Sequence, residues 1–311
     1  SVNSKLTVDY YKKSCPRFEE IVRQVVTDKQ MQAPTTAAGV VRLFFHDCMV
    51  ESCDASILIA STHNRKAERD HDINLSLPGD AFDVITRIKT ALELECPGIV
   101  SCSDIIAIAT RNLVVMVGGP HYEVRFGRKD GTVSDTSRVD ASLAKTTTPI
   151  DQIITMFGEK GLSVQELVAL LGAHTIGFTH CKEFAKRIYN FSPTSQNDPQ
   201  MDPEYAEALR KLCMNHTMVP QMSAFNDVFT PGKFDNMYYK NLRRRMALLQ
   251  SDQAVATDKR TRPFVDLYAA NQTAFFEAFG RAMQKVSILG VKTGRKGEVR
   301  RRCDQFNNFH P

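Results

Sequence analysis

Arg42 and His46 stand four residues apart in the stretch RLFFHDC (42–48), with two phenylalanines between them. In a helix this spacing places the guanidinium and the imidazole on one face. A neutral imidazole can take up a proton while a fixed cation stabilises negative charge nearby, so the pair suits acid–base chemistry. A structural interpretation stays open, with His46 as a core residue and Arg42 paired to Asp47, because ionisable clusters also arise in cores.

A second histidine, His174, lies at the end of an apolar helical pattern, in the segment of residues 169–177. An imidazole at the end of a buried helix could be an axial metal ligand, which normally needs a hydrogen-bond acceptor on its other ring nitrogen. Asp227, Asp235 and Asp252 each follow among apolar residues, and Asp252 is the best candidate for this acceptor. A single helical histidine is more often a core residue, so spacing alone does not decide.

Composition and cysteine usage indicate a secreted globular protein. The 311 residues are 42% hydrophobic, which is enough for a sizeable core. Eight scattered cysteines without a CxxC pair predict four disulfides in an oxidising compartment, and only Cys48 and Cys53 are close enough to suggest a pairing. The polar start at residues 1–9 suggests a mature product without its signal peptide. The most apolar region, residues 99–117, contains charged residues and predicts a buried helix rather than a membrane span.

The net charge of +5 comes partly from basic clusters at residues 243–245 and 292–302. These clusters indicate either a solvated surface or attachment to an extracellular polyanion such as an acidic cell-wall polysaccharide. No nucleic-acid recognition motif is present. The sequons at Asn190, Asn215 and Asn271 fit a secreted glycoprotein.

Helical periodicity dominates the segments that must position these residues. We expect helices in residues 18–26, from Pro34 to about 48, and in 80–94, 103–117, 163–171 and 261–286, the last as one long helix or two abutting ones. Ser163 and Glu166 form a capping-box pattern. Strand signals are few, such as residues 122–126, and residues 127–131 suggest a turn. Residues 192–203 suggest a loop.

Seven motifs together resemble the secreted plant haem peroxidases (class III): RLFFHDC (42–48), CDAS (53–56), VSCSD (100–104), GRKD (127–130), HTIG (174–177), FDN (234–236) and SDQ (251–253). They occur in family order and at family spacing, and the resemblance covers essentially the whole chain. It implies a mainly α haem-peroxidase fold, a single domain over 1–311 with distal and proximal helical halves around one haem b and few short strands.

The resemblance also implies an activity and its residues. A donor:hydrogen-peroxide oxidoreductase would use H₂O₂ to oxidise phenolic donors by successive one-electron steps through ferryl intermediates. The distal residues would be Arg42 as cation, His46 as base, Phe45 as apolar wall, Asn74 as the acceptor from His46, and Glu68 as the support of Asn74. On the proximal side, His174 would be the axial iron ligand and Asp252 its hydrogen-bond acceptor.

Two calcium sites and four disulfides follow from the same resemblance. The distal set comprises Asp47, Val50, Ser52, Asp54 and Ser56, and the proximal set comprises Thr175, Asp227, Thr230, Lys233 and Asp235. These are oxygen donors, as Ca²⁺ requires. The implied disulfides are Cys15–Cys96, Cys48–Cys53, Cys102–Cys303 and Cys181–Cys213. Asp104 and Arg128 match a buried structural ion pair.

Several residues depart from the family pattern. Ser52 stands where glycine is usual, Met49 where phenylalanine is usual, and Leu171 where serine is common. Ala144 and Glu183 differ from the residues expected at the substrate entrance, and the chain has no tryptophan. We expect a monomer in the extracellular space or cell wall, with the vacuole as an alternative. The competing interpretation is a non-catalytic extracellular protein that binds calcium or polyanions on a peroxidase scaffold.

Overall fold

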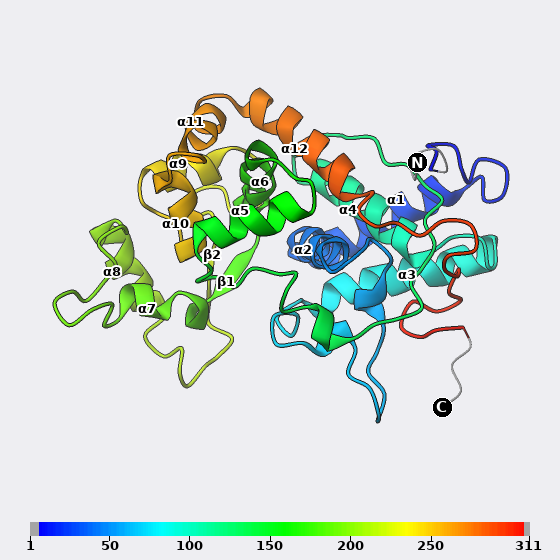
Figure 1. The fold of residues 1–311 in the computed structure, drawn as a ribbon, viewed down its shortest axis with the longest axis horizontal. Helices are drawn as coiled ribbons and strands as arrows, with labels where there is room; N and C mark the ends of the chain where they lie inside the picture. Colours follow the sequence, from blue (N-terminus) through cyan, green and yellow to red (C-terminus); the bar gives the residue numbers. More distant parts are fainter. Residues whose placement is uncertain (1–5, 308–311) are drawn as a thin grey trace. The chain divides into compact units, whose positions relative to one another are not determined.

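The chain is mainly α-helical, as the sequence predicts. The computed structural model describes residues 6–307, and within this range it contains twelve α-helices and one two-stranded sheet (Figure 1). The helices are α1 (Phe18–Gln32), α2 (Thr36–Met49), α3 (Gly79–Glu95), α4 (Cys102–Met116), α5 (Ile150–Glu159), α6 (Val164–Leu171), α7 (Ala185–Ile188), α8 (Pro203–Leu212), α9 (Met237–Arg243), α10 (Gln250–Thr257), α11 (Arg262–Ala270) and α12 (Gln272–Val286).

Two compact units make up the chain. The first contains the residues up to Leu143 together with those from Met283 onward, and the second is Ala144–Ala282. The prediction of one domain with two lobes stays a prediction.

In the first unit, helices α1, α2, α3 and α4 pack against one another (blue to blue-green in Figure 1). Gly39 of α2 allows this close packing, because a Cβ there would lie 2.5 Å from Pro78 Cγ, just before α3. Ser101 caps α4 by accepting a hydrogen bond from the Asp104 backbone amide at 3.2 Å. The packed bundle therefore fixes the helix that carries Arg42 and His46.

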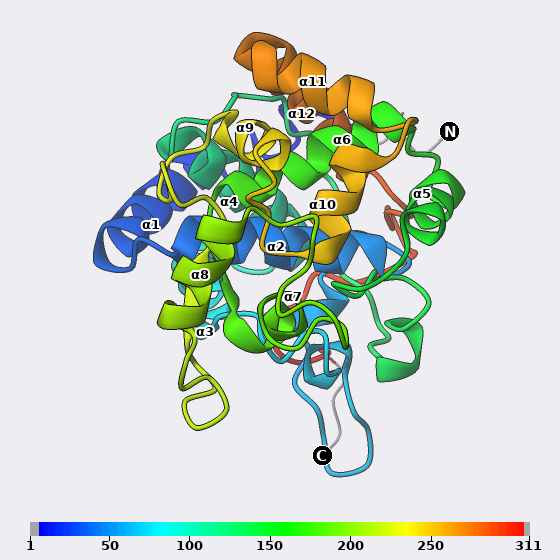
Figure 2. The ribbon, with the colours of Figure 1, turned by 90° about the vertical axis from the view of Figure 1, so that its left-hand side faces the viewer.

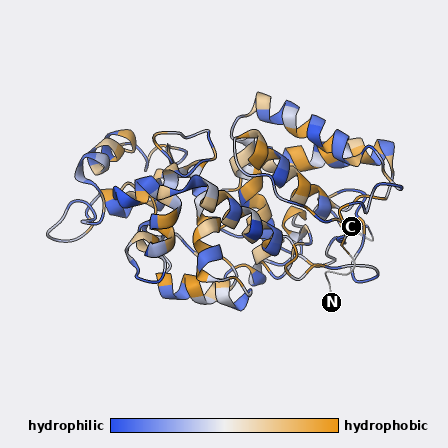
Figure 3. Ribbon diagram, turned by 90° about the horizontal axis from the view of Figure 1, so that it is seen from above, coloured by the Kyte–Doolittle hydropathy of each residue, from blue (hydrophilic) through white to orange (hydrophobic). Residues whose placement is uncertain are grey.

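In the second unit, α6 begins with the predicted capping box, in which Ser163 and Glu166 each bond the other's backbone amide. Helices α5, α9, α10 and α11 pack around this part of the unit. Helices α11 and α12 are separate and abut at Asn271, which settles the choice left open between one long helix and two. Figure 3 shows hydrophobic and hydrophilic residues alternating around the helical ribbons, as expected for amphipathic helices.

The second unit also contains a smaller cluster around α7 and α8, which lie side by side (Figure 2). Strand β1 (Phe178–His180) pairs antiparallel with β2 (Ser223–Phe225) in the register Phe178↔Phe225. The disulfide Cys181–Cys213 ties this cluster together. The other three disulfides lie in the first unit and have the pairings that the resemblance implies: Cys15–Cys96, Cys48–Cys53 and Cys102–Cys303.

Two local predictions were wrong. Residues 122–126 do not form a strand, because only Phe126 pairs, with Thr7. Residues 127–131 do not form a turn, because Lys129 and Asp130 make isolated bridges to Lys292 and to Glu298. In both cases the pairing partner is a segment far away in the sequence, which local pattern does not reveal. Among the helices of residues 6–307, none is long and apolar enough to cross a membrane.

Candidate active site

Arg42 and His46 lie one helical turn apart on α2, and Arg42 Nε donates to His46 Nε2 at 3.3 Å. The same guanidinium donates to the Ser76 carbonyl (3.1 Å) and hydroxyl (2.9 Å) and to the Ile73 carbonyl (3.1 Å). These acceptors fix the guanidinium beside the imidazole. Asp47, the alternative partner of Arg42, accepts instead from the backbone amide of Ala55 at 2.9 Å.

Asn74 orients the imidazole of His46. The Asn74 side-chain nitrogen donates to the Glu68 carbonyl at 2.7 Å, so its oxygen faces His46 Nδ1, at 2.6 Å. This arrangement assigns the ring proton to Nδ1 and the lone pair to Nε2. Burial and then the charge of Arg42 lower the pKa of His46 to about 3, although the bond to Asn74 raises it. His46 is therefore a neutral base at ordinary pH. The ring of Phe45 lies beside it, with centroids 6.4 Å apart.

His174 follows α6 in a short 3₁₀ turn (Gly172–Thr175). Its Nδ1 lies 3.0 Å and 3.2 Å from the two carboxylate oxygens of Asp252 in α10, so the lone pair of the neutral ring is on Nε2. Tyr238 also donates to Asp252, at 3.0 Å. Burial, and then the Asp252 charge, raise the pKa of Tyr238, which keeps this hydroxyl a donor. The pair thus has the arrangement that an axial histidine needs.

Gly172 lets the 3₁₀ turn of His174 lie against its neighbours. A Cβ at this position would fall 2.3 Å from the Tyr239 hydroxyl and 2.4 Å from Phe275 Cε2. Tyr239 in turn donates to the Val168 carbonyl at 2.8 Å near the end of α6. Packing against Tyr239 and Phe275 therefore fixes the position of His174 relative to the end of α6.

The distal set begins with Asp47 in the last turn of α2 and continues in the loop after the helix, where the Cys48–Cys53 disulfide links the helix end to the loop. Val50 ends the helix, and its carbonyl accepts from the Ser52 amide at 2.8 Å. Asp47, Asp54 and Ser56 are all buried. Burial first, and then the charge of Asp54, raise the pKa of Asp47 well above its usual value.

A cation would relieve this accumulation of buried negative charge, and the donors are the oxygens that Ca²⁺ prefers. Gly131 makes room for the loop, because a Cβ there would lie 2.3 Å from Asp54 Oδ2. The distal set fits a calcium ion in the chemistry of its donors.

The proximal set converges around one hydroxyl. Thr230 Oγ1 lies 2.9 Å from Asp227 Oδ2 and 3.2 Å from Asp235 Oδ1, and Thr175 Oγ1 lies 3.5 Å from the same Asp235 oxygen. The Lys233 amide donates to the Thr230 carbonyl at 3.0 Å, which places Lys233 in the same turn. These oxygens also suit Ca²⁺. In the described part of the chain, no three His, Cys, Asp or Glu side chains form a group that could hold a metal ion by themselves, so either set would depend on neutral oxygens as well.

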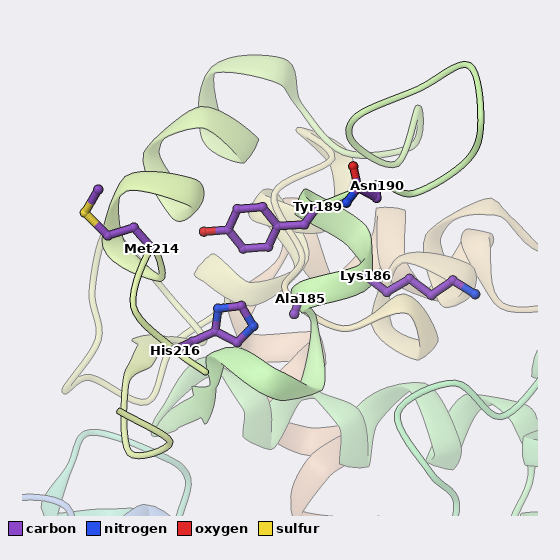
Figure 4. Close-up of a pocket in the computed structure, with 6 residues that line it drawn as sticks. All are labelled: Ala185, Lys186, Tyr189, Asn190, Met214 and His216. Atoms are coloured by element: carbon purple, nitrogen blue, oxygen red, sulfur yellow. The ribbon is translucent and has the colours of Figure 1, made fainter. Parts of the chain in front are cut away.

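The two entrance residues and one surface pocket involve none of the side chains described above. Ala144 and Glu183 are exposed. A surface pocket of about 430 Å³ in the second unit is lined by Ala185, Lys186, Tyr189, Asn190, Met214 and His216. Figure 4 shows the rings of Tyr189 and His216 in this pocket, and they stack with centroids 5.4 Å apart. None of the predicted catalytic or calcium residues lines it, so we do not assign it to catalysis.

The structural ion pair of the motifs is present: Arg128 Nη1 lies 2.7 Å from Asp104 Oδ1, and both side chains are fully buried. Sequence reasoning missed Ser76 and Tyr238, because a carbonyl or a tyrosine hydroxyl carries no motif. It also missed Lys292, whose ammonium contacts the distal set.

Comparison with known proteins agrees with this geometry. The family model described as "Peroxidase" matches residues 22–271. The chain is 65% identical to Peroxidase 6 of Arabidopsis thaliana over 309 residues, covering 99% of this chain and 94% of that protein. It is 58% identical to Peroxidase 65 of the same plant over 305 residues, covering 98% and 90% respectively.

The chain therefore belongs to the peroxidase family, and the predicted resemblance to plant peroxidases is confirmed. It is a haem peroxidase, and nothing in its residues favours the non-catalytic alternative. The particular roles of its site residues stay predictions.

Proposed function

We propose that this chain is a secreted peroxidase that binds one haem b and two calcium ions and uses H₂O₂ to oxidise small phenolic donors. The observation that carries the proposal is the pairing of a neutral, oriented His46 with a fixed Arg42 on one turn of α2. Haem, when bound, supplies the redox chemistry, and the chain supplies proton transfer and electrostatics. His174, with its proton on Nδ1 held by Asp252, would bind the iron through Nε2.

His46 moves the proton in this proposal. Its Nε2 takes the proton from one oxygen of hydrogen peroxide and returns it to the other oxygen, which leaves as water. Arg42 stabilises the negative charge on the leaving oxygen, and its position is preset by the carbonyls of Ile73 and Ser76. Asn74 keeps the accepting lone pair on Nε2 by holding the proton at Nδ1. Asp252 gives His174 anionic character, which favours the oxidised iron.

The experiment is stopped-flow reaction of the holoenzyme with H₂O₂, followed in the Soret band. We expect His46→Ala to slow this reaction by about 10²- to 10⁴-fold while haem stays bound, because a general base contributes about that much. The matched control is His121→Ala, which removes an exposed histidine that contacts Arg111. A His46→Ala rate similar to the wild-type rate would remove His46 from this role. Bound haem without any peroxide-dependent turnover would favour the non-catalytic alternative.

The calcium assignment has its own test. Asp47 directly follows His46, and Thr175 directly follows His174, so each proposed ion would hold the helix end that carries a histidine. Verified removal of calcium is expected to lower activity and alter the Soret spectrum. An unchanged spectrum and rate after removal would contradict the assignment.

The donor and the location rest on the sequence and the relatives. Because Ala144 and Glu183 depart from the family pattern at the entrance, and the chain has no tryptophan, we infer small phenols rather than bulky polymers as donors. Steady-state rates across simple phenols, hydroxycinnamyl alcohols and ascorbate test this inference. The basic clusters are consistent with retention on an acidic cell-wall polysaccharide.

A further inference from the structure

Lys292 places a positive charge directly on the distal calcium set. Its Nζ donates to Ser52 Oγ at 3.0 Å and to Asp54 Oδ2. The Asp54 side chain is only 5% exposed, whereas that of Lys292 is 30% exposed. The ammonium therefore lies between the buried carboxylate and the solvent. Because the lysine side chain is partly exposed, it can rotate away from Asp54 while the loop stays folded.

The backbone holds this segment against the loop. The Lys292 carbonyl accepts from the Lys129 amide at 2.8 Å. Gly290, with a φ of +57°, passes so close that a Cβ would lie 2.5 Å from the Glu51 carbonyl oxygen and 2.8 Å from Ser52 Cβ. Only glycine suits this position, because both its φ and its contacts exclude a side chain. The placement of Lys292 is thus built into the chain path.

Ser52 is the second partner of Lys292, and it stands where glycine is expected. In this loop the residues with positive φ are Glu51 (65°) and Ala55 (59°) and not Ser52, so a serine in place of the usual glycine causes no backbone strain here. Instead, the Ser52 hydroxyl accepts from the ammonium. The departure at Ser52 and the cation at Lys292 therefore act together.

The charges around the ammonium favour its presence. Asp47, Asp54 and Glu68 are all buried, so the loop and the neighbouring Glu68 concentrate negative charge away from water. A second cation, Arg300, lies nearby, but its guanidinium donates to backbone carbonyls, including that of Ala55 at 2.8 Å. Lys292 is the cation that contacts the Asp54 carboxylate itself.

We propose that Lys292 is a built-in counter-ion of the distal loop that competes with Ca²⁺ for Asp54 and so weakens calcium binding there. This inference rests on the distal calcium site of the proposed function. Calcium binds carboxylate oxygens at about 2.3–2.6 Å, so both cations cannot contact the same oxygen without strong repulsion. Calcium at Asp54 Oδ2 has to displace the ammonium, and calcium at Oδ1 binds beside a like charge, so Lys292 opposes calcium in both cases. When calcium is scarce, the ammonium offsets the negative charge of the loop.

The test measures calcium binding rather than activity. Holoprotein is equilibrated in chelator-buffered calcium, and bound calcium per chain is determined by atomic emission. Asp235→Asn disables the proximal set, so that only distal binding is titrated in that background. There we expect Lys292→Met to tighten distal binding by at least about tenfold, equivalent to about 1.4 kcal/mol. Lys292→Arg, which keeps the charge, should retain the weaker binding.

Lys296→Met is the matched control, because it removes the same charge from an exposed lysine four residues away. It should leave distal affinity unchanged. If Lys292→Met folds poorly, Lys292→Gln gives the same comparison. A second readout is thermal unfolding in excess chelator, where Lys292→Met should melt below the wild type and gain more from added calcium.

Two failures can be told apart. If Asp54→Asn and Asp235→Asn leave the number of bound calcium ions unchanged, the calcium assignment is wrong, and this inference falls with it. If each removes one ion but Lys292→Met binds distal calcium no more tightly than Lys296→Met, the calcium sites stand and only the role of Lys292 is refuted.

Discussion

Replacing Asn74 tests whether orientation of the His46 imidazole controls the reaction with peroxide. Asn74→Leu removes the oxygen that lies 2.6 Å from His46 Nδ1. A buried N–H without an acceptor costs about 1–3 kcal/mol, so the tautomer with its lone pair on Nε2 loses that much of its advantage. Since only this tautomer can accept a proton at Nε2, the rate should fall by about 5- to 150-fold.

The assay is the second-order reaction of the holoenzyme with H₂O₂ in stopped flow, measured across pH. Asn112→Leu, on α4 and outside every proposed site, is the control and should react at the wild-type rate. In the wild type the rate should fall only as pH approaches about 3, because His46 is protonated below its pKa and then cannot act as base. An Asn74→Leu rate within twofold of the wild type would refute the orienting role.

Asn74→Asp separates orientation from simple packing. The aspartate keeps an acceptor beside His46 Nδ1 but adds a negative charge, which favours the protonated imidazole and raises its pKa by about 1–3 units. The acid limb of the peroxide reaction should therefore move to higher pH, while the rate on the plateau falls less than in Asn74→Leu. If Asn74 had only a structural role, Asn74→Leu and Asn74→Asp would have similarly lowered plateau rates. The acid limb of the pH profile would then stay near its wild-type position.

Three further predictions follow from packing and charge. Gly172→Ala should destabilise the fold by about 1–3 kcal/mol, because its Cβ would fall 2.3 Å from a tyrosine hydroxyl; Gly158→Ala, with nothing within 4 Å of its Cβ, should not lower the melting temperature. Asp104→Ala should cost about 3–5 kcal/mol in denaturant unfolding, since it leaves a fully buried guanidinium without the carboxylate that balances its charge. Glu207→Gln, in an ion pair whose carboxylate is half exposed, should change stability far less than Asp104→Ala, and equal losses in the two variants would contradict this distinction. Asp252→Asn should raise the reduction potential of the haem-loaded protein in potentiometric titration, because His174, the proposed axial ligand, would lose its anionic partner. An unchanged potential would count against this role.

The sequence determined those features that depend on neighbours along the chain. Helical spacing placed Arg42 and His46 on one face of α2, and the capping box at Ser163 began α6 where expected. Local signals for strands failed, because a strand exists only when another segment supplies its hydrogen bonds. The stretch at residues 122–126 finds only a single bridge, whereas β1 forms without any clear local pattern.

The tertiary structure decided which partners each functional side chain receives. Asn74 meets His46 across 28 residues, and Asp252 meets His174 across 78. From sequence, Asp252 was the best of three candidate aspartates for His174, and the contact of Asn74 with His46 was implied only by the family resemblance. Hydrogen bonds between distant residues leave no periodic pattern. The resemblance gave no sign of Lys292, which reaches Asp54 from 238 residues away. Its ammonium reaches that carboxylate because the fold packs the segment around Gly290 against the loop. The charge of Lys292 therefore gains its proposed role only in the folded chain.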